Sequence, residues 1–132
     1  MATYTYKDVA NALADVDKQI KDFLASCVAS AMKSVDTWQS AVEHDRYTIA
    51  FCTEQINFAK KIKKRYGDRD GYCAHEIKFN RQRRADAKQE LKKDLEILAE
   101  AEARLARNIA EASEHGVDVS SITASPAVLA AM

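Results

Sequence analysis

Residues 60–71 read KKIKKRYGDRDG, and this stretch decides the fold because it separates two long segments without glycine or proline. Its basic residues place positive charge in the last turn of a helix, where they meet the negative end of the helix dipole. Gly67 follows, at the position where a helix favours a left-handed residue. Asp68 or Asp70 can then cap a second helix. The stretch therefore predicts a tight helix–helix turn at residues 67–71.

The composition on both sides of this turn favours helices over sheets. The chain has 132 residues, of which three are glycine, one is proline and 23 are alanine. Alanine and long charged side chains lose little entropy in a helix, whereas sheets need turn residues that this chain lacks. We therefore expect an all-α protein.

Apolar residues recur along both segments with the alternating four-three spacing of a heptad repeat. In the first segment they are Val9, Leu13, Val16, Ile20, Phe23, Cys27, Ala31, Val35, Trp38, Val42, Ile49, Cys52, Ile56 and Ala59. In the second they are Leu91, Leu95, Leu98, Leu105, Ile109 and Ala112. An extra four-residue step near Ala31 indicates a stutter, and one position of the seam is vacant at Asp45.

Two architectures fit this pattern. In the first, residues 1–116 form a long antiparallel helical hairpin, coiled-coil-like, in which the second helix ends near Leu24. In the second, a break at residues 34–37 produces a three-helix bundle. We favour the hairpin because the apolar register continues through the possible break. Residues 117–132 follow as a short apolar C-terminal tail or docking segment.

Charge is segregated along the chain although the formal net charge is zero. Residues 1–60 carry six basic and eight acidic side chains, a net of −2. Residues 61–93 carry 12 and five, a net of +7, and residues 94–132 carry two and seven, a net of −5. In a hairpin the basic block would lie at the tip.

The second segment has no large apolar residue between Asn80 and Glu90. Either the two helices approach closely over alanine there, or Arg81, Arg84 and Lys88 reach acidic residues of a partner.

Sequence motifs give no support to an enzyme. No P-loop, GxGxxG, GxSxG, HExxH or EF-hand pattern occurs. The ligand spacing of a zinc or di-iron site is also missing, so we expect no metal and no cofactor. Three widely spaced cysteines without a CxxC pair suit the cytoplasm or another reducing compartment. We read no classical secretion signal and expect no membrane insertion.

We therefore expect a non-enzymatic structural or adaptor subunit that self-associates or docks with other protein subunits. The contacts would be the helical seams, the basic tip and the tail. The expected contact residues are Tyr4, Tyr6, Val9, Leu13, Val16, Lys61, Lys64, Arg65, Arg81, Arg83, Arg84, Val128 and Leu129.

The alternative function is binding of nucleic acid or another polyanion by the basic region 60–84. Its best residues are Lys60, Lys61, Lys63, Lys64, Arg65, Lys78, Arg81, Arg83 and Arg84, with Tyr66, Tyr72 and Phe79 available to stack on bases. We rank it second because the pI of 6.8 is low for a nucleic-acid-binding domain. Asp68, Asp70 and Glu76 would also repel phosphate.

Overall fold

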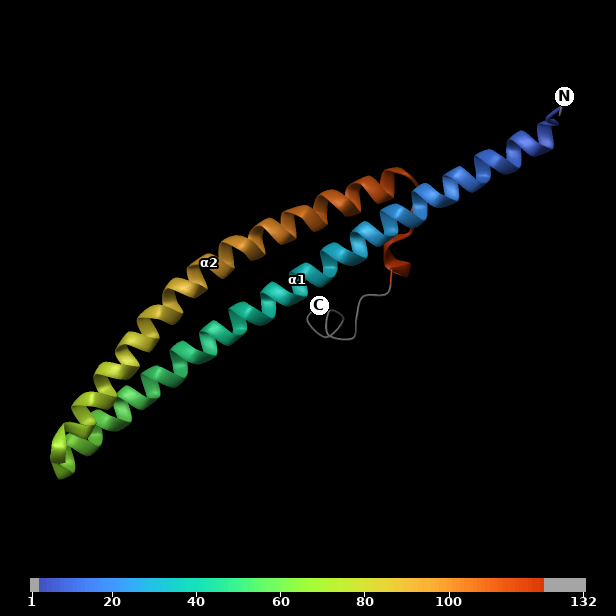
Figure 1. Cartoon of the computed structure of the whole chain (residues 1–132). Coiled ribbons are helices and arrows are strands. Elements are labelled where there is room, and N and C mark those ends of the chain that lie inside the picture. Colours follow the sequence, from blue (N-terminus) through green and yellow to red (C-terminus); the bar gives the residue numbers. More distant parts are fainter. Residues whose placement is uncertain (1–2, 123–132) are drawn as a thin grey trace. The chain divides into compact units, whose positions relative to one another are not determined.

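A computed structural model describes residues 3–122 and shows an all-α helical hairpin, as predicted (Figure 1). Among these residues there is no β-strand. The elements are α1 (Tyr6–Tyr66), the 3₁₀ turn η1 (Arg69–Gly71), α2 (Tyr72–Glu114) and the 3₁₀ turn η2 (Val119–Ser121). Helix α1 runs through residues 34–37 without a break, so the alternative of a three-helix bundle is wrong.

The turn between the helices forms as the sequence predicts. Gly67 has a φ of 82° and its N–H donates to the carbonyl of Lys63 at 3.0 Å, which ends α1. The carboxylate of Asp68 accepts hydrogen bonds from the N–H groups of Cys73 at 2.7 Å and Ala74 at 3.1 Å. Asp68 is therefore the cap of α2. Asp70 lies inside the turn, with a φ of 60° that aspartate tolerates better than most residues.

The chain packs as two units. Of the described residues, the first combines 3–36 with 100–122, and the second comprises Thr37–Ala99. In the first unit, α1 and α2 bury one apolar cluster. Its buried members are Leu24, Val28, Met32 and Ala112, with Leu105, Ile109, Val117, Val119 and Ile122 packed against them. The side-chain amide of Asn108 also donates to the carbonyl of Cys27 at 3.3 Å.

Helix α2 ends at the predicted glycine stop. The N–H of Val117 donates to the carbonyl of Ala112 at 3.0 Å, and that of Gly116 to Ser113 at 3.1 Å. This is a Schellman motif, and it turns Val117 onto the apolar cluster. A Cβ at Gly116 would lie 4.0 Å from Cε of Lys21, so α2 ends in the region of α1 that the hairpin requires.

The C-terminal tail begins as a packed segment. Val117, Val119 and Ile122 lie on the apolar cluster of the first unit. Asp118 caps η2 by accepting from the N–H of Ser120 at 3.1 Å. The predicted contact residues Val128 and Leu129 lie outside the described residues.

The second unit is packed largely over small side chains. Ile56, Ala59 and Ile77 form its apolar cluster, and Cys52 and Ala87 are also buried. The guanidinium of Arg84 donates to the hydroxyl of Thr53 at 3.2 Å. Of the residues between Asn80 and Glu90, Ala87 is buried, and Arg84 has a polar partner in its own chain.

The predicted register of the seam needs one correction. Phe23 is 66% exposed and Leu24 only 7%, and Val28 is fully buried next to half-buried Cys27. With Leu24 and Val28 in place of Phe23 and Cys27, the four-three spacing runs without interruption from Leu24 to Ala59. The stutter is therefore not near Ala31; the extra four-residue step lies between Ile20 and Leu24. Asp45 occupies the vacant seam position and is buried.

Candidate functional site

The first candidate surface is the start of α1, residues 6–23, which we call the N-terminal segment. Thr5 and Asp8 form its cap: the Asp8 N–H donates to the Thr5 hydroxyl at 3.2 Å, and the Thr5 N–H donates to the Asp8 carboxylate at 3.0 Å. The backbone and side-chain hydrogen bonds from Thr5 lower the pKa of Asp8. The segment is thus a well-initiated helix.

The N-terminal segment carries an apolar stripe that the described chain leaves uncovered. Every residue from Thr3 to Ile20 is exposed, and in Figure 1 the blue start of α1 extends beyond the end of α2. We call five of its residues the uncovered stripe; their exposed fractions lie between 43% and 66%. They are Val9, Leu13, Val16, Ile20 and Phe23.

Two tyrosines flank the stripe at the helix start. Tyr4 lines an open hollow of about 580 Å³ together with Val9 and Leu13. Tyr6 does not line this hollow and is almost fully exposed. The structure therefore brings three of the five predicted N-terminal contact residues to one hollow. Val16 lies further along the same stripe.

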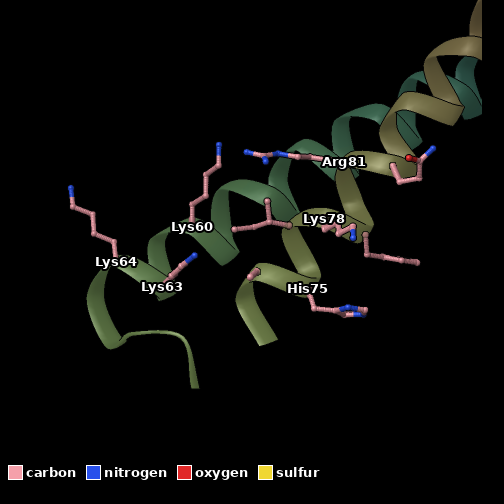
Figure 2. Close-up of a pocket in the computed structure, with 10 residues that line it drawn as sticks. Lys60, Lys63, Lys64, His75, Lys78 and Arg81 are labelled. Carbon is pink, nitrogen blue, oxygen red and sulfur yellow. The ribbon is translucent and has the colours of Figure 1, made fainter. Parts of the chain in front are cut away.

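The second candidate surface is a groove at the hairpin turn, which we call the tip groove. It has a volume of about 940 Å³, and both helices contribute to it (Figure 2). Helix α1 supplies Lys60, Lys63 and Lys64, and α2 supplies Ala74, His75, Ile77, Lys78, Phe79, Arg81 and Gln82. The ring of Phe79 is 55% exposed, so part of the groove is aromatic and open to solvent.

The charge of the tip groove is poorly compensated. Lys63 has one carboxylate nearby, that of Asp68 at 4.0 Å. Within residues 3–122, no carboxylate forms an ion pair with Lys60, Lys64 or Arg81. The same holds for Lys78, and none of the ten residues that line the groove is acidic.

The structure places only two of the six predicted basic contact residues, Lys64 and Arg81, in the tip groove. Lys61 lines a separate hollow beside Phe58. The Arg65 guanidinium lies 5.5 Å from the centroid of the Tyr66 ring.

The remaining two predicted basic residues contact their own chain. The Arg83 guanidinium lies 5.6 Å from the centroid of the Phe51 ring, and Arg84 donates to Thr53. His75, by contrast, lines the groove although no sequence motif assigned it to binding. The sequence feature that could have identified His75 as a groove residue is helical spacing, because residues 75, 78 and 82 recur at three- and four-residue steps on one face of α2.

Cys73 is buried at the start of α2. Burial, followed by the nearby Asp68 carboxylate, raises the pKa of Cys73, which is the opposite of what a reactive thiolate needs. In the part of the chain that the structure describes, no three His, Cys, Asp or Glu side chains are grouped to hold a metal ion. Over the same residues, no helix combines the length and apolar character that a membrane crossing requires.

Comparison with known proteins adds no family to this description. The chain matches no protein-family model, no curated protein and no solved structure at a significant level.

Proposed function

We propose that this chain is a non-enzymatic structural subunit that self-associates through the uncovered stripe of its N-terminal segment. The observation that carries the proposal is a capped helix whose first five turns bear an apolar seam with nothing packed on it among the described residues. A seam of this kind is the surface that a coiled coil buries.

The energetics support a second helix on this stripe. Most helical stability in proteins comes from packing of an apolar face rather than from intrinsic helix propensity. Burying a large aliphatic or aromatic side chain contributes about 1.5–3 kcal/mol. Pairing two copies of the stripe would bury ten such side chains, five from each chain.

The flanking residues suit a second copy of the same segment. Ala10 and Ala12 lie beside Leu13 on the edges of the stripe, and their small size permits close approach of two helices. Asp17 and Gln19 flank Val16 and Ile20 on opposite edges. In a parallel pair, the edge residue that directly precedes a stripe residue on one helix lies opposite an edge residue that directly follows a stripe residue on the other helix. Asp17 would therefore meet Ala12, and no like charges would be opposed.

Sedimentation velocity in about 0.15 M salt tests this proposal, because the hydrophobic contact should persist at an ionic strength that screens surface charge. We expect a dimer whose population grows with protein concentration. The double substitution Leu13→Asp with Val16→Asp should leave a monomer. The matched control, Asn11→Asp with Ala14→Asp, adds the same number of carboxylates to the opposite face of the segment and should still associate.

Circular dichroism should show the same helix content for both double variants, so that loss of folding is not mistaken for loss of association. A wild-type protein that is monomeric at every concentration would overturn the proposal. So would a Leu13→Asp, Val16→Asp variant that associates like wild type.

A further inference from the structure

Five cations from both helices line the tip groove, and within residues 3–122 only Lys63 among them has an acidic partner. The basic region 60–84 has ten basic and three acidic side chains, and the three acidic residues do not line the groove. Asp68 is already engaged by the N–H groups at the start of α2 and lies near Lys63. The carboxylates that would repel phosphate are therefore outside the groove.

The cations are spaced along the groove in two rows. Lys60 and Lys64 are one helical turn apart on α1, about 5–6 Å along the axis. Lys78 and Arg81 are three residues apart on α2, which also places them on one face of the helix. Figure 2 shows their side chains projecting from the two helices around the groove. Two rows of donors suit an anion with repeated charges.

The groove also offers an aromatic surface to the same ligand. Phe79 is 55% exposed and lines the groove beside Ile77. Proteins that bind single strands combine a positively charged groove with aromatic rings on which unpaired bases stack. Bases in a duplex are already stacked on each other, so a duplex would gain less from Phe79.

We propose that the tip groove binds single-stranded nucleic acid, with phosphates held by Lys60, Lys64, Lys78 and Arg81 and a base stacked on Phe79. This site goes beyond the proposed assembly role, because it lies in the second unit and uses none of the uncovered stripe. An acidic peptide would form ion pairs with the cations but would bring no base to stack on Phe79.

Fluorescence anisotropy with a labelled oligothymidine, on nuclease-treated full-length protein, tests the site. The logarithm of the binding constant should fall with the logarithm of salt concentration, with a slope of about −0.7 for each phosphate contacted. Four cations in contact predict a slope of roughly −3. A duplex of equal length should bind more weakly at the same salt concentration.

Two variants separate the charged and the aromatic contributions. Lys78→Gln with Arg81→Gln should make the slope shallower by about 1.4. The control, Lys88→Gln with Lys92→Gln, removes the same charge from α2 outside the groove and should leave the slope unchanged. Phe79→Ala should weaken binding about tenfold without changing the slope. Its control is Phe58→Ala, which removes an exposed ring from a separate hollow.

Competing ligands complete the test. Equal affinity for polyglutamate of matched charge would overturn the proposal in favour of an acidic protein partner. Binding to anionic phospholipid vesicles without binding to the oligonucleotide would overturn it in favour of a membrane surface. An unchanged slope in the Lys78→Gln, Arg81→Gln variant would also overturn it, because the groove would then not be the site.

Discussion

The carboxyl group of Asp45 on α1 faces that of Asp94 on α2, at a position of the seam where an apolar side chain is expected. Asp45 is 8% exposed, and its Oδ2 has no hydrogen-bond partner among residues 3–122. Burial raises the pKa of Asp45 to about 6, and Asp94 and Glu90 add to the effect while His44 opposes it. A proton on Asp45 would supply the donor that two facing carboxylates lack.

We predict that Asp45 makes the hairpin less stable as the pH rises. The pKa of Asp45 is raised from its ordinary value of 3.8 to about 6 in the folded chain, so the folded state holds the proton more tightly than the unfolded state. The stabilisation of the fold by the proton on Asp45 is complete below about pH 4 and is lost as the pH rises through about 6. We expect a loss of about 2–3 kcal/mol between about pH 4 and 7.5.

Urea unfolding followed by circular dichroism, at one protein concentration, measures this effect. Asp45→Asn removes the titrating group, and the difference between wild type and this variant should change with pH as described. Asp22→Asn, which alters an exposed aspartate on α1, should unfold with the pH profile of wild type. A constant difference between wild type and Asp45→Asn would show that Asp45 does not hold a proton in the fold.

A second prediction concerns the same seam position with an apolar side chain. Asp45→Leu completes the four-three pattern between Val42 and Ile49 and removes a buried charge that has no ion-pair partner within residues 3–122. Replacing buried charges by apolar residues is often stabilising, and we expect a gain of about 1–2 kcal/mol near pH 7.5. At about pH 4.5 the gain should shrink, because the protonated wild type is no longer penalised. A destabilised variant at neutral pH would mean that the carboxyl group makes a needed contact.

Asp45 also shows how far the sequence determines the fold. The glycine stops, a cap at Asp68 or Asp70 and the vacant position at Asp45 could all be predicted, because each depends on local backbone chemistry or on helical period. The register at the start of the seam could not. Phe23 and Leu24 are both apolar and adjacent, and the choice between them depends on where α2 ends.

The tip groove was predictable only in part, for a related reason. The basic region as a whole is visible in the sequence. Six of the residues that the polyanion-binding alternative names line the groove: Lys60, Lys63, Lys64, Lys78, Phe79 and Arg81. Which cations share a groove depends on the pairing of α1 with α2. The contacts of Arg83 with Phe51 and of Arg84 with Thr53 depend on the same pairing. No sequence spacing within one helix contains that information.

The third prediction compares a buried and an exposed residue two positions apart. Ile56 is 2% exposed and belongs to the apolar cluster of the second unit, whereas Phe58 is 61% exposed. Ile56→Ala should lower the free energy of unfolding by about 2–5 kcal/mol, and Phe58→Ala by less than about 0.5 kcal/mol. Ile56→Val, expected to cost about 0.5–1.5 kcal/mol, keeps the comparison measurable if the alanine variant does not fold. Equal costs at the two positions would contradict the packing of α1 against α2.

The last prediction tests the turn that decides the fold. Asp68 accepts hydrogen bonds from the N–H groups of Cys73 and Ala74, so Asp68→Ala should leave two donors at the start of α2 without their partner. Loss of a cap of this kind costs about 0.5–2 kcal/mol. Asp68→Asn keeps one acceptor oxygen and should cost less. Because the Asp70 side chain does not cap α2, Asp70→Asn should unfold like wild type. Urea unfolding of the three variants decides the matter: if Asp70→Asn lost as much stability as Asp68→Ala, the cap would be assigned to the wrong aspartate.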